Sequence, residues 1–341
     1  MSGEAATLLP RKVSLRVPAT TANIGPAYDT LGMTLSIFME LTVELAETFS
    51  MTVTGEGQEY ISTGEDNMVV QTCRIAFEEY AHKSMPPLKF TMHNSIPYKC
   101  GCGSSSAAAV GGFVAGMTLS GLTMETQNSE SLLSAISEIE GHSDNAAPAI
   151  YGGIQLVYKK DDGRVMTYHV PTPPNLSIVL FVPHKLMKAS THVTRDLVPT
   201  TVSLRDAVHN ISSTAILTLA LSTGDLRMLK DASDCLHEQQ RSGKLYPHYS
   251  PCAKAAREAG AVHAFLSGAG PSVCAMVPGR HGDLLTQPMG ERKAEVVAEA
   301  MVKAAEAVGV QGRVIITMPS DLGVHLSGTT CIHPNIQYTS I

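Results

Sequence analysis

The sequence contains no apolar run long enough to cross a bilayer and no excess of positive charge. Its formal net charge is -6 at pH 7, which argues against a nucleic-acid partner, because such proteins present a basic surface to the phosphates. The first residues, MSGEAATLLPRK, lack the basic stretch and apolar core that mark a secretory signal. These absences predict a cytoplasmic protein that binds neither nucleic acid nor membrane.

Close pairs of cysteines are also scarce. The chain has 7 cysteines, an odd number spread widely along the sequence, and a disulfide framework is therefore not expected. A structural zinc site usually needs two close pairs of ligands, whereas Cys100 and Cys102 are the only cysteines near each other. We expect reduced cysteines that hold no metal.

What the chain does contain is an ordinary globular composition, with 44% hydrophobic and 16% charged residues. Its 341 residues exceed the usual size of one core, so two domains are expected. Apolar alternation predicts strands over residues 12–19, 38–47, 49–57, 88–97, 152–160, 177–184 and 312–319, and a strand–glycine turn–strand unit over 262–277. Helical spacing predicts helices over residues 66–84, with Asp66 as the cap, and over 104–122, 129–141, 203–225, 234–241 and 291–308.

Strands lead each half of the chain, and helices lie between them. This order favours an α+β fold over a doubly wound parallel sheet. The polar, proline-bearing stretch 161–177 is the candidate junction between two domains. We place these domains at residues 1–165 and 166–341.

The stretch IPYKCGCGSSSAAAV, residues 96–110, lies between a predicted strand and a predicted helix. Gly101 and Gly103 allow positive φ angles and let an anion approach the backbone closely. The free N–H groups at the start of the helix point back at this loop, and the following serines add hydroxyl donors or one magnesium ligand. The pattern is neither a Walker A motif nor a dinucleotide fingerprint. It predicts a polyphosphate site, with a plain turn and helix cap as the alternative.

Two further stretches, together with this one, resemble the three ordered motifs of the GHMP small-molecule kinases. The first motif is VPATTANIGPAYDTLGMTL (residues 17–35), the second is the pattern Pro97-x3-Gly101-x-Gly103-Ser104-Ser105 (residues 97–105), and the third is HAFLSGAGPSVCAMV (residues 263–277). The resemblance implies a two-domain α+β fold. Its N-terminal domain would be similar to ribosomal protein S5, with a left-handed βαβ unit, and would bind ATP. Its C-terminal domain would be ferredoxin-like, and the active site would lie at the interface.

Within this family, four stretches are most similar to the members that phosphorylate homoserine: residues 18–32, 140–153, 190–199 and 236–247. The resemblance implies ATP-dependent phosphorylation of the side-chain hydroxyl of L-homoserine to O-phospho-L-homoserine, a step of threonine biosynthesis. It also implies a homodimer, although no helix of the sequence shows a diagnostic apolar stripe.

The resemblance assigns the ATP and metal sites residue by residue. Ser105 and Glu140 would hold Mg²⁺ across the β- and γ-phosphates, with Glu138 as the rival carboxylate. The chain departs from the family at Cys102, where Leu is usual, and at Ser106, where Ala is frequent. Asn67 would contact adenine or, alternatively, cap a helix. The full set of implied ATP-binding residues is Asn67, Pro97, Lys99, Cys100, Gly101, Cys102, Gly103, Ser104, Ser105 and Ser106.

The amino-acid substrate would be held by opposite charges. Arg195 and Arg241 match the arginines of the family that bind the α-carboxylate, and Asp29 matches the residue that meets the ammonium or hydroxyl end. The remaining residues implied to bind the substrate are Asn23, His142 and Gly268.

Proton removal from the hydroxyl distinguishes the members of the family. Mevalonate-type members place an Asp at the position of Asn145, and an amide cannot accept a proton at neutral pH. The resemblance therefore implies direct transfer without a dedicated base, with Asp144 as the alternative base. Asn23, Asp29, Asn145 and Arg195 are the implied catalytic residues.

Three other functions compete with this interpretation. A mevalonate- or phosphomevalonate-type kinase would need a cluster of Lys and Arg and a base at position 145, and neither is clear here. A non-catalytic metabolite-binding relative would have lost the metal carboxylate or the loop serines, and both are present. A zinc or redox module built on Cys100 and Cys102 has too few ligands.

Overall fold

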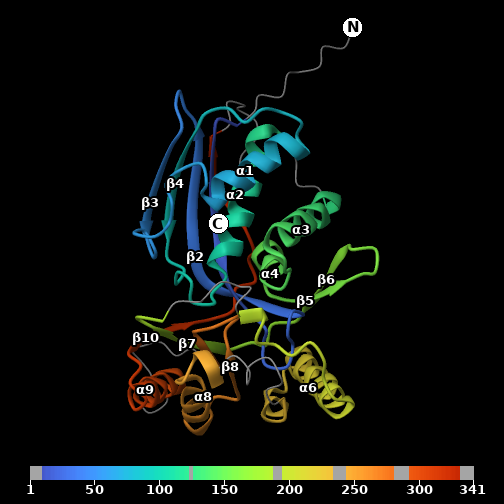
Figure 1. Cartoon of the computed structure of the whole chain (residues 1–341), viewed down its shortest axis with the longest axis vertical. Helices are drawn as coiled ribbons and strands as arrows, with labels where there is room; N and C mark the ends of the chain where they lie inside the picture. Colours follow the sequence, from blue (N-terminus) through green and yellow to red (C-terminus); the bar gives the residue numbers. More distant parts are fainter. Residues whose placement is uncertain (1–9, 123–125, 187–193, 233–242, 280–291, 331–341) are drawn as a thin grey trace.

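The structure is a computed structural model that describes residues 10–122, 126–186, 194–232, 243–279 and 292–330. Within these residues the strands form two sheets, and each sheet carries helices (Figure 1). The first sheet and helices α1 to α4 make up the upper part of the view, and the second sheet lies below with α8 and α9. No helix in the described part of the chain is long and apolar enough to cross a membrane.

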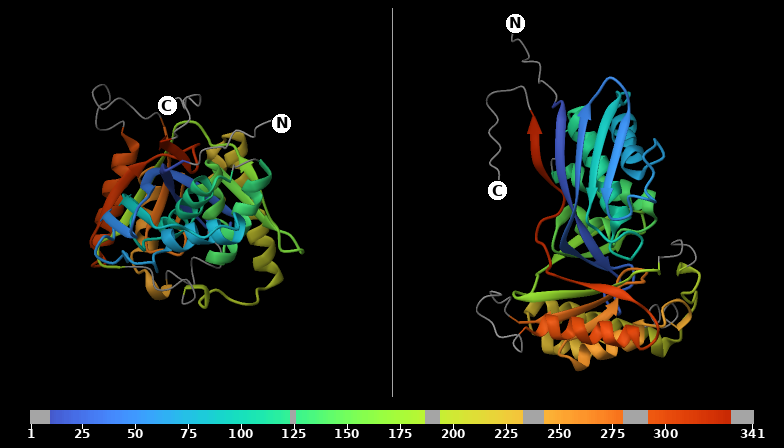
Figure 2. Two further views of the ribbon diagram at one scale, coloured as in Figure 1. Left: turned by 90° about the horizontal axis from the view of Figure 1, so that it is seen from above. Right: turned by 90° about the vertical axis from the view of Figure 1, so that its left-hand side faces the viewer.

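The first sheet has seven strands, in the order β11-β1-β2-β4-β3, and the hairpin β5–β6 pairs with β2 through β5. Among these strands, only β3 and β4 run parallel. Figure 2 shows β11, from the end of the chain, beside β1. The strands are β1 (Lys12–Ala22), β2 (Leu31–Leu45), β3 (Ser50–Gly55), β4 (Leu88–Asn94), β5 (Ile154–Lys159), β6 (Val165–Val170) and β11 (His325–Thr330).

Four helices accompany the first sheet. These are α1 (Met68–Ile75), which continues as a short π-helix (Ala76–Tyr80), α2 (Ser104–Ser120), α3 (Thr126–Glu140) and α4 (Ala146–Tyr151). Most of α2 is buried, because its small residues allow close packing against α1 and β1. The helix that delivers the second motif is therefore at the centre of this core.

The second sheet has the order β10-β7-β9-β8, with antiparallel neighbours throughout. Its strands are β7 (Leu176–Pro183), β8 (His263–Leu266), β9 (Val273–Pro278) and β10 (Gly312–Thr317). Helix α8 (Tyr249–Glu258) precedes β8, and α9 (Lys293–Glu306) precedes β10. This order of elements is that of the ferredoxin-like arrangement. Helix α6 (Leu204–Thr223) and a short 3-10 helix (Leu226–Lys230) fall between β7 and α8.

The predicted strands and most predicted helices are present, with several differences. Asn67, rather than Asp66, caps α1, because its side chain accepts the hydrogen bond from the Val69 N–H. The predicted helix over 234–241 lies outside the described residues. Helices α4 and α8 and strand β11 were not predicted.

The stretch proposed as a junction contains strand β6, which pairs with β5 in the first sheet. Strand β11, near the other end of the chain, pairs with β1 in the same sheet. The first sheet therefore takes strands from both sides of residue 165, whereas all four strands of the second sheet follow that residue. The division at 165/166 stays a prediction.

Candidate active site

The second motif forms a tight loop at the start of α2. Gly101 and Gly103 have φ angles of +78° and +68°, and Gly103 is the residue that begins the helix. No side chain caps this end of α2, and its first turn carries no acidic residue. Its N–H groups and positive dipole end therefore remain available to an anion.

Both glycines are required by neighbouring chain as well as by backbone angle. A Cβ atom on Gly103 would collide with the side chain of Thr20, in the first motif. A Cβ atom on Gly101 would collide with the carbonyl oxygen of Ser267, in the third motif. The three motifs, far apart in sequence, meet at this loop.

Hydrogen bonds fasten the three motifs together. The Thr20 N–H donates to the Cys102 carbonyl at 3.1 Å, and the Gly268 N–H donates to the Ala22 carbonyl at 2.9 Å. The Ser267 hydroxyl donates to the Gly101 carbonyl at 2.8 Å. The polar groups of the loop that face its neighbours are thus satisfied internally, which leaves its outer side for a ligand.

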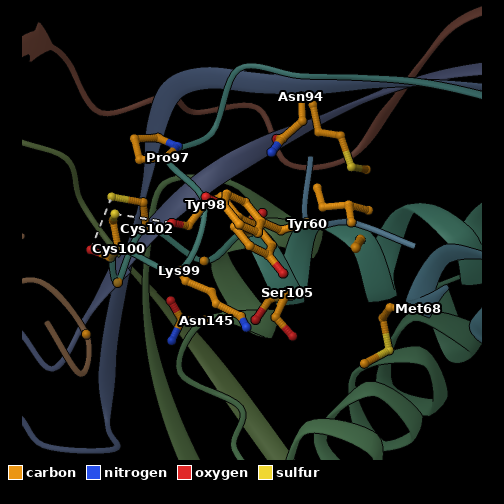
Figure 3. Close-up of a pocket in the computed structure, with 18 of the residues that line it drawn as sticks. Tyr60, Met68, Asn94, Pro97, Tyr98, Lys99, Cys100, Cys102, Ser105 and Asn145 are labelled. Carbon is orange, nitrogen blue, oxygen red and sulfur yellow. Dashed lines mark hydrogen bonds between the residues drawn. The ribbon is translucent and has the colours of Figure 1, made fainter. Parts of the chain in front are cut away.

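A cavity of about 490 Å³ opens above this loop (Figure 3). This volume is in the range of a small-molecule site. All the residues implied to bind ATP line it, as do His142, Asn145 and Gly268. The remaining lining residues are Met39, Tyr60, Ile61, Ser62, Asp66, Met68, Met92, Asn94, Tyr98, Ala108 and Ala269.

Glu140 lies at the C-terminal end of α3 and faces the serines of the second motif. The Ser105 hydroxyl donates to the Glu140 carboxylate at 2.6 Å, and the Ser106 hydroxyl donates to its other oxygen. Glu138 lies elsewhere: with burial as the larger cause, its charge raises the pKa of Tyr80. Ser105 and Glu140 present hydroxyl and carboxylate oxygens, the donors that Mg²⁺ prefers. These two side chains fit a magnesium ion as part of its ligand set. The described residues contain no group of three or more His, Cys, Asp or Glu that could hold a metal.

The first motif carries two residues with left-handed backbone. Asn23 and Asp29 have φ angles of +57° and +55°, values that are uncommon outside glycine and recur at functional sites. The Asn23 side-chain oxygen accepts a hydrogen bond of 2.7 Å from the Asp29 N–H. This bond fixes the direction of the Asp29 side chain.

Asp29 forms a two-pronged ion pair with Arg195. The guanidinium donates to the two carboxylate oxygens at 2.7 Å and 3.0 Å, and it also donates to the Tyr28 hydroxyl at 3.3 Å. Burial alone would lower the pKa of Arg195, but the hydrogen bonds and charge of Asp29 raise it above the ordinary value. The guanidinium of Arg195 therefore stays charged. Arg241, the second arginine implied to bind a carboxylate, lies outside the described residues.

Asp144 and Asn145 lie at the start of α4, and their surroundings differ. The Asn145 side-chain oxygen accepts a hydrogen bond of 2.9 Å from the Thr20 hydroxyl, and Asn145 lines the cavity. Asp144 is 2% exposed and does not line the cavity. Burial acts to raise the pKa of Asp144, but the hydrogen bond and charge of His142, 3.2 Å away, keep it below the ordinary value.

Comparison with known proteins accounts for this arrangement. The model of the GHMP kinases N terminal domain matches residues 67–153, and that of the GHMP kinases C terminal domain matches residues 217–306. The chain belongs to the GHMP kinase family. It has the two-domain α+β fold of that family, as the resemblance of its three motifs implies.

Relatives of this GHMP kinase are named homoserine kinase. The protein of Moorella thermoacetica is 40% identical over 267 residues, which cover 78% of this chain and 88% of the relative. That of Desulfitobacterium hafniense is 34% identical over 302 residues, or 88% of this chain and 95% of the relative. The crystal structure of homoserine kinase from Cytophaga hutchinsonii matches with a TM-score of 0.78 at 24% identity, covering 96% of this chain and 99% of that chain.

Cys100 and Cys102 of this GHMP kinase are buried apolar side chains. Burial raises the pKa of Cys100 to about 11 and that of Cys102 to about 12, so both remain thiols at neutral pH. The Cys100 thiol donates to the Tyr98 carbonyl at 3.2 Å. The described cysteines are free, and the described residues contain no group of three or more His, Cys, Asp or Glu that could hold a metal.

Asn67 caps α1, which is one of the two roles that the sequence left open, and its contact with adenine stays a prediction. Its side-chain oxygen accepts from the Val69 N–H at 2.9 Å, and its amide nitrogen donates to the Ser62 carbonyl at 2.6 Å. Asn67 nevertheless lines the cavity. It therefore shapes the wall mainly by fixing the start of α1 against the preceding loop.

Sequence reasoning missed several residues that build the site. Thr20 and Tyr28 lie inside the first motif, but nothing in their spacing separates them from their polar neighbours. Tyr60 and Tyr98 also line the cavity, with parallel rings whose centres are 6.2 Å apart. Tyr60 follows a glycine-rich turn far from any motif, so only the folded chain reveals it.

Proposed function

We propose that this GHMP kinase transfers the γ-phosphoryl group of ATP to the side-chain hydroxyl of L-homoserine, giving O-phospho-L-homoserine. Relatives named homoserine kinase, similar over most of the chain, support this function. The observation that carries it is the presence of both an ion pair of Asp29 and Arg195 and an uncapped N-terminus of α2. One fixed anion and one fixed cation match the ammonium and carboxylate of an amino acid, while the helix end matches the phosphates.

The second motif would hold the phosphates of ATP. The N–H groups at the start of α2 and the hydroxyls of the serines face the side of the loop that opens into the cavity. Ser105 and Glu140 would hold Mg²⁺, which supplies neutralisation of the charge on the β- and γ-phosphates when it is bound. The hydrogen bonds that Ser105 and Ser106 donate to Glu140 hold its carboxylate next to the serines, at the proposed magnesium site.

The substrate would enter by exchange with an internal ion pair. In the structure, the charges of Asp29 and Arg195 neutralise each other. A zwitterion can replace each partner at once: its ammonium takes the place of Arg195 on Asp29, and its carboxylate binds the released guanidinium, together with Arg241. A substrate with one charged end would leave one of these groups without its partner, which would weaken binding of that substrate.

Transfer would proceed without a dedicated base. Asn145, held by Thr20, can donate a hydrogen bond from its amide but cannot accept a proton. The Asp144 carboxylate is buried and already accepts hydrogen bonds from His142 and the Asn145 N–H. Orientation of the hydroxyl and electrostatic stabilisation then supply the rate enhancement, and the proton leaves late or to the phosphate.

The nucleobase would occupy the end of the cavity between Asn67 and the tyrosines. Tyr60 and Tyr98 offer aromatic faces there, and Met68 offers a polarisable side chain. The chain has no tryptophan, so tyrosine dominates its intrinsic fluorescence. Titration with ATP would quench this emission, and the Tyr60→Leu variant would lose most of the change.

The protein would act as a homodimer through α6, in the cytoplasm where the proposed substrates are found. Helix α6 has exposed apolar residues at helical spacing, with Leu204 81%, Val208 54%, Ile211 68% and Leu219 50% exposed. From residue 207 to its end, α6 carries no Asp, Glu, Lys or Arg. An uncharged apolar face is complementary to a copy of itself, and Figure 1 shows α6 at the edge of the molecule.

A coupled assay of ADP release tests the proposed reaction. Homoserine, mevalonate, phosphomevalonate and galactose are compared at equal concentration with saturating ATP and magnesium. Turnover of homoserine above the other three is expected. Turnover of one of the others without homoserine would replace the proposal with that substrate.

A further inference from the structure

Two buried side chains donate hydrogen bonds to the turn of the third motif, residues 267–272. The Tyr246 hydroxyl donates to the Ala269 carbonyl at 3.0 Å, and His248 Nε2–H donates to the Pro271 carbonyl at 2.9 Å. Tyr246 is 4% exposed and His248 is fully buried. Both belong to the segment that leads into α8, and neither lines the cavity.

These contacts specify the shape of the turn. Gly270 has a φ angle of +78°, and a Cβ atom on it would collide with the Tyr246 ring. The ring therefore lies directly against the backbone of the turn, while its hydroxyl holds the preceding carbonyl. Burial lowers the pKa of His248, which keeps the imidazole neutral with its proton on Nε2 for the Pro271 carbonyl. A buried carbonyl needs such a donor.

The turn is also hydrogen-bonded to the loop of the second motif. The Ser272 N–H donates to the Cys100 carbonyl at 3.3 Å, and the Ser267 hydroxyl donates to the Gly101 carbonyl at 2.8 Å. Gly268 and Ala269, between these two anchors, line the cavity themselves. A shift of the turn would therefore move the backbone on which the phosphates are expected to rest.

We propose that Tyr246 and His248 are positioning residues for the phosphate-binding backbone, acting through residues 267–272 of the third motif. The inference rests on the proposed function in taking ATP as the ligand of the cavity. It adds a supporting layer that contacts neither nucleotide nor substrate. A merely structural role is the competing explanation, because Tyr246 also belongs to the core of the second sheet.

The test measures binding of the magnesium complex of a non-hydrolysable ATP analogue by calorimetry. His248→Leu removes the donor to Pro271, whereas His248→Gln places an amide N–H at the same reach. We expect about tenfold weaker binding for H248L and binding within about threefold of the original for H248Q. Tyr246→Phe, which removes only the hydroxyl, is expected to weaken binding about fivefold.

Tyr249→Phe is the matched control, because Tyr249 is buried in the same core and lies within α8, after the two residues that hold the turn. It should bind the analogue as the original chain does, even where its unfolding temperature falls. If H248L and Y246F bind normally, or if H248Q is as weak as H248L, the inference is wrong. Should H248L not fold, the comparison of Y246F with Y249F decides.

This experiment separates the inference from the proposed function. Analogue binding needs no phosphoryl acceptor, so a failure of homoserine turnover would leave the comparison of variants intact. Failure of the original chain to bind the analogue would overturn both.

Discussion

Asp29 and Arg195 show how a single pair of side chains can prepare a site for a zwitterion. Their two-pronged contact holds each group in the geometry that its ligand partner will need, so little reorganisation is left for binding. The ion pair must open before the substrate can bind. Because each side chain of the pair is about one-third exposed, water can assist that exchange.

Replacement of Arg195 by lysine tests this pairing. Lysine keeps the charge but cannot present two parallel N–H groups to a carboxylate. We expect the KM for homoserine to rise about a hundredfold and the KM for ATP to stay within about threefold. Steady-state kinetics with each substrate varied in turn gives both values. A rise in the ATP KM alone would place Arg195 at the wrong substrate.

Asp144 tests the mechanism without a base. Asp144→Asn keeps the shape and the hydrogen bond with the neighbouring N–H but removes the possibility of accepting a proton. We expect kcat to stay within about tenfold, because the carboxylate does not line the cavity. A loss beyond about a thousandfold in single-turnover phosphoryl transfer would show that Asp144 acts as the base.

At the level of secondary structure, the start of α2 is the decisive element. Its N-terminus is left uncapped, and the preceding glycines allow β1 and the third motif to approach the loop closely. Side chains cap α1 at Asn67 and α6 at Ser203, whereas α4, α8 and α9 begin, like α2, without a side-chain cap. An uncapped start with serine hydroxyls is suited to an anion rather than to stability alone.

Gly103→Ala tests the close approach. The new methyl group would collide with Thr20 and would also be strained at a φ angle of +68°. We expect the kcat/KM for ATP to fall more than about a hundredfold. Gly163→Ala is the matched control, because Gly163 has a φ angle of +86° with nothing within 4 Å of a new Cβ atom. It should lower the free energy of unfolding by about 1 kcal/mol and leave kinetics unchanged.

The elements differ in how far the sequence reveals them. Apolar and polar residues alternate clearly in strands β1, β2 and β4, because one face of each strand packs against the core. The three motifs indicated which segments form the site. Strand β6 was taken for a junction because its exposed Tyr168 and His169 make it look polar. The cap at Asn67 was assigned to Asp66 because both residue types suit a cap, and only backbone geometry separates them.

Long-range contacts were beyond the sequence. The pair of Asp29 and Arg195, separated by 166 positions, could be expected only through family resemblance, not from spacing. The apolar face of α6 was also missed, because buried residues such as Leu217 and Leu221 make the helix apolar on its inner side too. Such a helix shows no clean stripe until the fold distinguishes its two faces.

In the whole molecule, the two sheets are joined where the motifs meet, and α6 contributes to that junction. The side chains of Asn210 and Thr214, on its inner face, donate to the Pro26 carbonyl in the first motif at 3.0 Å and 3.2 Å. The outer face of the same helix is the proposed dimer contact. The proposed dimer contact would therefore lie on the side of α6 opposite to Pro26.

Ile211→Lys tests the dimer. A charge at the middle of the apolar face would be buried without a partner in the proposed contact, so the variant should sediment as a monomer. Tyr158→Lys, at a residue that is 55% exposed on the first sheet, should sediment as the original chain does. Sedimentation velocity at several concentrations measures both. If both variants and the original share one sedimentation coefficient, α6 is not the contact.

The account depends most on recognition of both charged ends of an amino alcohol next to ATP. Phosphorus NMR of the product, with homoserine, 4-hydroxybutyrate and 3-aminopropan-1-ol as acceptors, measures this directly, because the last two each lack one charged end. We expect phosphorylated homoserine with a kcat/KM at least about a hundredfold above either analogue. Equal transfer to 4-hydroxybutyrate, or no transfer to homoserine, would contradict the account.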